Sequence, residues 1–156
     1  MSSLRKPGLG PIVGHTTHHS CRLWIAASNT DTAREKESEE RRTLGVIGVV
    51  QEGGKVDPNS ISYFRLHRGH NRTGTFNLGA EPSLKKGGGL SAVQPLSPAT
   101  VYRVRLSTLS LDDAFDNDYE VSDEKLIERL PDPSTWADVL NRMPEAYVEA
   151  QFKTYS

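Results

Sequence analysis

The sequence has 156 residues, enough for one domain with a real core. Its hydrophobic content of 35% is low and its charged content of 25% is ordinary, which favours a modest core with long polar insertions over a compact enzyme. The 19 basic and 20 acidic residues give a formal net charge of −1, which excludes a strong field for nucleic acid or anionic membranes.

The sequence was also searched for a membrane span and for a signal peptide. No apolar run approaches the roughly 18 residues of a membrane span, so we expect no membrane partner. The first residues contain no apolar segment of the kind found in signal peptides, which leaves the cytoplasm as the default expectation for the compartment.

Period-two alternation and short apolar runs predict an all-β domain. Residues 1–8 are polar and end in Pro-Gly, which predicts a flexible lead-in before a single domain over residues 9–156. We expect strands at residues 12–15, 21–27, 44–50, 60–67, 75–78, 90–93, 101–106 and 147–154. Residues 29–42 are almost purely polar and predict a mobile loop.

The stretch over residues 9–28 predicts two strands joined by a turn that holds three histidines. In the second strand, Cys21, Leu23 and Ile25 alternate with polar or small residues and form the natural core face. Trp24 points to the opposite face, which is unusual for so large an apolar side chain. We therefore expect Trp24 to lie under an inserted segment or at an interface with a partner.

A second stretch that indicates the fold lies at residues 96–106. Tyr102, Val104 and Leu106 share one face of the predicted strand, and Pro98 makes the corner before it. The Tyr102 hydroxyl can reach back to upstream backbone, as in the tyrosine corner of Greek-key sandwiches. Position, turn chemistry and alternation therefore agree on a β-sandwich.

An insertion at residues 112–144 separates this strand from the last one. Its first part is acidic, and its second part predicts a helix that begins after Asp132-Pro133 and ends before Pro144. The spacing i, i+3, i+4 and i+7 predicts one apolar helix face, made of Trp136, Val139, Leu140 and Met143.

Short motifs suggest a known family. The pattern Leu96-x-Pro98-x-Thr100-x-Tyr102 and the closing segment at residues 151–154 resemble a fibronectin type III domain. With the segments at residues 10–14 and 22–24, the chain more specifically resembles the amino-terminal domain of PhoD-type alkaline phosphatases. The resemblance implies a fibronectin type III or immunoglobulin-like Greek-key β-sandwich with a helical insertion before the last strand.

In that family the sandwich precedes a metallophosphoesterase domain, whose Asp-x-His and Gly-Asp-x-x-Tyr motifs do not occur here. The resemblance therefore implies a non-catalytic accessory domain that packs against a catalytic domain of the same polypeptide. We expect no enzyme activity and no cofactor in this chain alone, no nucleic-acid partner, and no catalytic residue. The alternative is a stand-alone sandwich that binds glycans or a protein.

His15, His18 and His19 are the densest cluster of candidate metal ligands. Few acidic or thiolate groups lie near them in the sequence, which favours polar turn histidines that face a partner domain. His67 and His70 could join them only if the fold brings the two turns together. Our predicted interface consists of these three turn histidines with Trp24.

Two further features give weaker indications of a functional site. Asp116-x-Asp118-x-Glu120 resembles the start of a calcium loop, but Val121 stands where the turn glycine is needed, so a solvated acidic loop is favoured. Cys21 is the sole cysteine, and its place on a predicted core face favours an inert buried thiol over a nucleophile.

Overall fold

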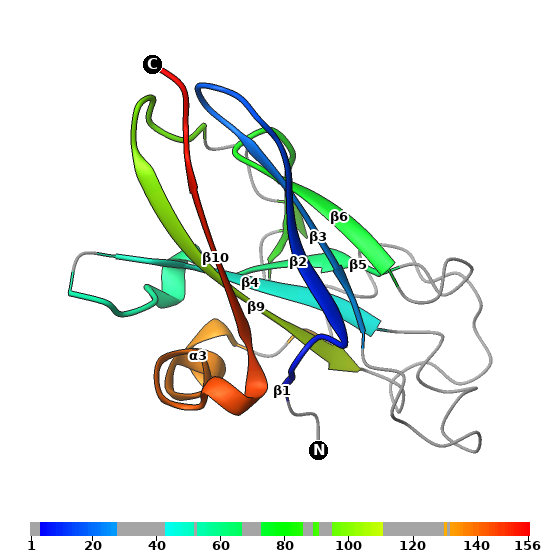
Figure 1. Cartoon of the computed structure of the whole chain (residues 1–156). Coiled ribbons are helices and arrows are strands. Elements are labelled where there is room, and N and C mark those ends of the chain that lie inside the picture. Colours follow the sequence, from blue (N-terminus) through cyan, green and yellow to red (C-terminus); the bar gives the residue numbers. More distant parts are fainter. Residues whose placement is uncertain are drawn as a thin grey trace.

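The computed structural model describes residues 4–27, 43–51, 53–66, 73–85, 89–90, 95–110, 130 and 132–156 (Figure 1). These residues form two antiparallel β-sheets packed face to face, with little helix, so the all-β prediction is confirmed at this level. Within the described residues, no helix combines the length and apolar character needed to cross a membrane.

The smaller sheet has three strands and the larger has seven. The smaller sheet follows the order β2 (Leu9–Thr16), β3 (Cys21–Ala26) and β6 (Thr73–Leu78). The larger sheet follows the order β1 (Leu4–Arg5), β9 (Val101–Ser110), β4 (Thr43–Val50), β5 (Ser62–Arg65), β7 (Leu84–Lys85) and β8 (Gly89–Leu90). Strand β10 (Val148–Lys153) pairs with β9.

The core between the sheets is built from the alternating positions that the sequence predicts. It contains the buried side chains Cys21, Leu23, Ile25, Ala27, Ile47, Phe64, Leu66, Phe76, Val104, Leu106, Ala150 and Phe152. Because successive residues of a strand point to opposite faces, each of these strands contributes every second side chain. The predicted core face of β3 is confirmed.

A second core lies on the outer face of the larger sheet, under the helical segment. It contains Leu4, Leu44, Val46, Val56, Ile61, Tyr63, Leu84, Leu109, Leu130, Trp136 and Leu140. The Trp136 indole N–H donates a hydrogen bond of 2.9 Å to the Tyr63 hydroxyl, and both residues are buried. Burial is the main cause that raises the pKa of Tyr63 to about 12, so this hydroxyl stays protonated. The larger sheet is therefore covered on both faces.

The helical segment consists of a 3-10 turn at Pro133–Trp136, the helix α3 (Ala137–Arg142) and a 3-10 turn at Pro144–Ala146. The Asp132 carboxylate accepts the Ser134 N–H at 3.0 Å, which supports the predicted start of this segment. Met143 was expected on the buried face but is 45% exposed. The reason is that α3 ends at Arg142, because the residue before a proline disfavours helical backbone.

Arg105 of β9 ties α3 to the larger sheet. Its side chain is only 9% exposed, and its Nη1 donates to the Leu140 carbonyl oxygen over 2.7 Å. Carbonyls in the last turn of a helix lack partners within the helix, so Arg105 satisfies one of them. The Arg105 Nε donates to Glu149 Oε1 over 3.1 Å, and the guanidinium lies 5.0 Å from the centre of the Tyr147 ring. Arg103 Nη2 reaches the same Glu149 oxygen at 3.0 Å.

Glu149 gives a pH-dependent prediction. Burial alone raises its pKa, but the hydrogen bonds and charges of Arg103 and Arg105 together hold the pKa below its ordinary value of 4.5. A carboxylate with a lowered folded pKa stabilises the fold above its unfolded pKa, and this stabilisation is lost as the pH falls through the folded pKa. Glu149→Gln should therefore reduce the loss of unfolding free energy between about pH 6 and about pH 3.

The effect should not exceed about 1 kcal/mol, because the Glu149 side chain is 37% exposed. Urea unfolding midpoints of the parent chain and of Glu149→Gln at several pH values measure it. Identical pH slopes for the two proteins would contradict the prediction.

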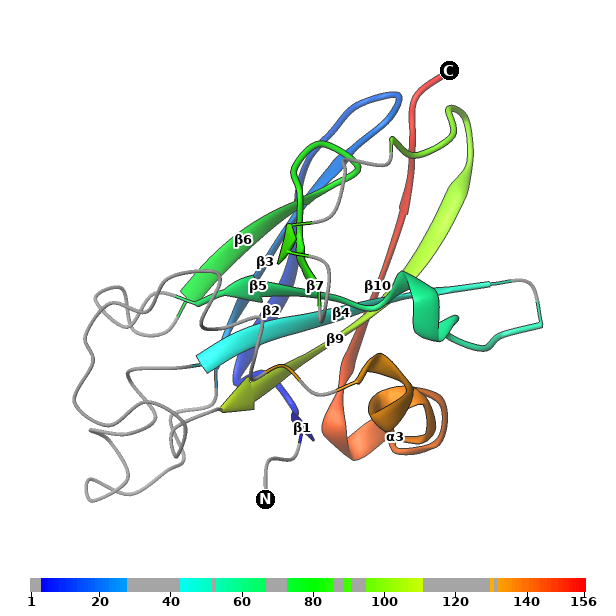
Figure 2. The same cartoon turned by 180° about the vertical axis from the view of Figure 1, so that it is seen from behind.

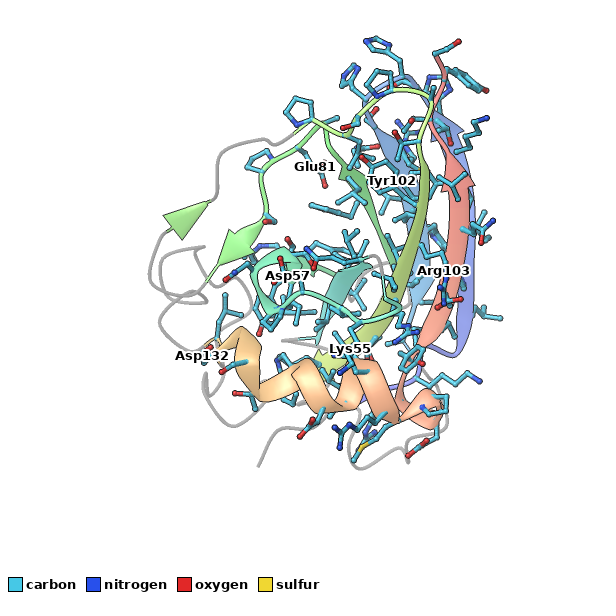
Figure 3. All side chains as sticks on the ribbon, turned by 90° about the vertical axis from the view of Figure 1, so that its left-hand side faces the viewer. Lys55, Asp57, Glu81, Tyr102, Arg103 and Asp132 are labelled. Carbon is cyan, nitrogen blue, oxygen red and sulfur yellow. The ribbon has the colours of Figure 1, made fainter. Side chains whose placement is uncertain are left out.

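The corner before β9 has the predicted contact. The Tyr102 hydroxyl accepts the Ser97 backbone N–H at 2.8 Å, and the Tyr102 ring stacks on Phe152 with centres 5.6 Å apart. In Figure 3, Tyr102 lies in the half of the molecule away from the helical segment, whose start is marked by Asp132. This contact joins the loop at residues 95–100 to the core between the sheets.

The lead-in predicted for residues 1–8 is wrong at Leu4 and Arg5. These residues form β1 and pair with Leu109 and Thr108 of β9, and Leu4 is buried. The pairing is non-local, so no local pattern predicts it. Strands β7 and β8 and the 3-10 turn at Pro58–Ser60 complete the described elements. The polar loop at residues 29–42 and the acidic part of the insertion lie outside the described residues.

Candidate functional site

The structure separates the predicted interface residues into two surfaces. His18 and His19 lie in the turn between β2 and β3, at the end of the molecule where Figures 1 and 2 place the C-terminus. His15 is exposed near the end of β2, and Trp24 lies in the middle of β3.

The histidine turn is held by its own hydrogen bonds. The Thr17 N–H donates to the Ser20 carbonyl at 2.8 Å, and the Thr17 hydroxyl oxygen accepts the N–H groups of His19 and Ser20 at 3.1 and 3.0 Å. A threonine that accepts backbone N–H groups in this way fixes a tight turn. The His18 and His19 rings meet edge to face, with His18 Nε2 and His19 Nδ1 3.2 Å apart.

Two other segments are joined to this turn through the backbone. The Tyr155 N–H donates to the Thr17 carbonyl at 3.1 Å, and the Tyr155 carbonyl accepts the Ala99 N–H at 2.9 Å. The Leu96 N–H donates to the His19 carbonyl at 2.8 Å. The Tyr155 side chain is 64% exposed beside them. We call the surface formed by His18, His19 and Tyr155 the histidine end.

The metal hypothesis gains no support from the geometry. Within the residues that the structure describes, no group of three or more His, Cys, Asp or Glu side chains could hold a metal ion. The pair formed by His18 and His19 could give a single metal ion at most one ring nitrogen from each imidazole. His67 and His70, the other histidines considered from the sequence, lie outside the described residues, as does the acidic motif that starts at Asp116.

Trp24 lies on the outer face of the smaller sheet and is half-buried. One of the two predicted positions for Trp24, under the inserted helix, is wrong, because that helix covers the outer face of the larger sheet. Trp24 pairs with Ile12 on one side and with Thr75 on the other, so the three residues form a row across the sheet. Ile12 is 56% exposed.

A polar row runs beside the tryptophan row. Arg22 pairs with Asn77, and the Arg22 Nε donates to the Asn77 Oδ1 over 3.1 Å. The Asn77 Nδ2 then donates to Glu81 Oε2 over 3.2 Å. We call the surface formed by Trp24, Thr75, Arg22, Asn77 and Glu81 the tryptophan face. Sequence reasoning missed Asn77 and Glu81, because their link to Arg22 is made across the sheet.

Cys21 is buried, and the Thr16 hydroxyl lies 3.5 Å from its sulfur. Burial raises the pKa of the Cys21 thiol, which disfavours the thiolate needed for nucleophilic attack. We expect an aromatic disulfide reagent near pH 8 to label Cys21 at least about tenfold more slowly in the folded chain than in denaturant. Absorbance of the released thiolate measures the rate, and equal rates would contradict a buried thiol.

No protein-family model matches the sequence, and no curated protein matches it significantly.

Proposed function

We propose that this chain is a non-catalytic accessory domain of a PhoD-like phosphatase or phosphodiesterase, with a fibronectin type III-like sandwich. The observation that carries the proposal is the strand order. Strands β2, β3 and β6 form one sheet, and β10, β9, β4 and β5 are neighbours in the other. This is the order expected of a fibronectin type III-like Greek key, and the contact between Tyr102 and Ser97 supports it.

The histidine end is our proposed contact surface for the catalytic domain. In the family that the sequence resembles, that domain follows the sandwich along the chain, so the segment after β10, which includes Tyr155, would lead toward it. The Tyr155 backbone is bonded to Thr17 and Ala99, which fixes the direction of the chain there. An exposed tyrosine with imidazoles suits an interdomain contact, since aromatic residues are enriched at interfaces and interdomain contacts are more polar than cores.

The first test addresses the family and the absence of catalysis. We expect the native reading frame to encode the Asp-x-His and Gly-Asp-x-x-Tyr motifs beyond Ser156. We also expect the chain alone to hydrolyse neither p-nitrophenyl phosphate nor bis-p-nitrophenyl phosphate with calcium, iron or manganese added. A reading frame that stops at Ser156, or metal-dependent turnover by this chain alone, would overturn the proposal.

The second test addresses the contact surface. With the two domains expressed as separate chains, Tyr155→Ala combined with His18→Ala should weaken their association at least about tenfold, measured by calorimetry. The fold should survive, because the bonds of Tyr155 to its neighbours use only its backbone. Met143→Ala is the matched control, since Met143 is 45% exposed and lies beside the helix, away from the histidine end. Equal weakening by the control would contradict this surface.

A further inference from the structure

We propose that the tryptophan face is a carbohydrate-binding platform, on which a pyranose ring of a polysaccharide stacks against Trp24. This proposal does not depend on the accessory role. The proposal starts from the position of Trp24 in the central strand of a three-stranded sheet, where the buried side chains of β3 and β6 on the opposite face belong to the core.

The two tryptophans of the chain have opposite surroundings. Trp136 is 4% exposed, and its indole N–H is bonded to Tyr63. Trp24 is half-buried, and its indole N–H has no hydrogen-bond partner among the described residues. A tryptophan usually finds a partner for this group when it is buried, and it presents an apolar ring with a polar tip when it is at a surface. Trp24 therefore offers both a stacking surface and a free donor.

Beside the ring lies a set of planar polar groups that are already oriented. Arg22, Asn77 and Glu81 are joined by hydrogen bonds of 3.1 and 3.2 Å, so the guanidinium, amide and carboxylate hold one another in place. Figure 3 labels Glu81 at the same end of the molecule as Tyr102. Each group keeps unused donors or acceptors, and binding to groups held in advance costs less ordering entropy. Adjacent donors and acceptors are what vicinal sugar hydroxyls require.

Strand β2 has a glycine, Gly14, beside Arg22. A Cβ at Gly14 would lie 3.5 Å from the Arg22 Cβ and 3.7 Å from its Cδ, in ordinary contact. With no side chain at Gly14, the Arg22 stem is uncovered on that side, and Arg22 is exposed. Arg22 of the polar row is therefore accessible on the same face of the sheet as the Trp24 ring.

Charge and polarity favour a neutral sugar over a protein partner. Strands β2, β3 and β6 contain no carboxylate and no lysine. The tryptophan face has one cation, Arg22, and one carboxylate, Glu81, which offset each other and are both hydrogen-bonded to Asn77. Protein hot spots are centred on side chains that become fully desolvated within apolar surroundings. Trp24 instead has Thr75 and the polar row around it, and Ile12 supplies apolar surface on only one side. Uncharged hydroxyl groups match this set of partners.

The test follows the two indole N–H signals by NMR. Cellohexaose, xylohexaose, laminarihexaose, mannohexaose and chitohexaose are each titrated into the full chain, and Trp24→Phe assigns the signals. We expect at least one sugar to shift the Trp24 signal saturably and leave the Trp136 signal in place. No shift of the Trp24 signal with any of the five sugars at about 10 mM would overturn the proposal.

Variants then separate this site from general effects. Trp24→Ala should abolish binding of the active sugar, and Asn77→Ala should weaken it at least about fivefold. Met143→Ala, an exposed apolar change away from the tryptophan face, should leave binding unchanged. Unchanged binding in Trp24→Ala would overturn the proposal. So would a Trp24 signal that shifts with protein concentration in the absence of sugar, because a second copy of the chain would then occupy the face.

Discussion

Trp136→Ala should lower the free energy of unfolding by about 3–5 kcal/mol, the range for removing a buried tryptophan. The side chain is 4% exposed and fills the core under α3 with Leu140 and Val56. Its removal leaves a cavity between the helical segment and the larger sheet, and it also leaves the buried Tyr63 hydroxyl without its indole partner. Equilibrium unfolding in urea, followed by far-UV circular dichroism, measures the change.

Tyr63→Phe is the control that isolates the hydrogen bond from the packing. It keeps the ring volume but leaves the indole N–H buried and unpaired, which should cost about 1–3 kcal/mol. We expect the free energy of unfolding to be lowest for Trp136→Ala, intermediate for Tyr63→Phe and highest for the parent chain. If Trp136→Ala unfolds at the same urea concentration as the parent, the helical segment is not part of the cooperative fold.

Local alternation was sufficient to predict much of the sandwich. In β3 the period of two placed Cys21, Leu23 and Ile25 in the core, and all three are fully buried. In β9 it placed Val104 and Leu106 on the same side, and both are fully buried. These positions could be predicted because a strand that is half-covered shows its two faces directly in the sequence.

What the alternation could not predict is that the larger sheet is covered on both faces. The sequence places Arg103 and Arg105 together on the face away from the sandwich core. Only Arg105 is buried there, because the helical segment folds back over part of that face. The pairing of Leu4 with Leu109 is equally long-range. Such contacts depend on how distant segments meet, which no local pattern contains.

In the candidate site, too, local alternation predicted the position of single residues but not their long-range neighbours. Trp24 was identified as out of place in the core from its position in the strand, and it does lie on the outer face. Its grouping with His18 and His19 came from closeness in the sequence, whereas the structure puts them on different surfaces. Asn77, which contacts Arg22 on the tryptophan face, is 55 residues away along the chain. Neighbours across a sheet require the register, and the register is known only from the fold.

Arg105→Ala should lower the free energy of unfolding by about 2–4 kcal/mol, because it removes a buried cation and leaves the Leu140 carbonyl unpaired. The substitution also removes the contact with the Tyr147 ring and one of the two hydrogen bonds to Glu149. Arg103→Ala is the matched control on the same strand. It removes the other bond to Glu149, but the Arg103 side chain is 41% exposed, so its cost should stay below about 1 kcal/mol.

Comparing the two variants shows which role of Arg105 dominates. If the ion pair with Glu149 were the main contribution, both variants and Glu149→Gln would cause similar small losses in urea unfolding. If the hydrogen bond from Arg105 to the Leu140 carbonyl of α3 dominates, only Arg105→Ala causes a large loss of unfolding free energy. Hydrogen exchange in α3 then rises far above that in the Arg103→Ala variant. We expect the second pattern, because only Arg105 reaches the Leu140 carbonyl, and a buried carbonyl without a partner costs more than an exposed ion pair contributes.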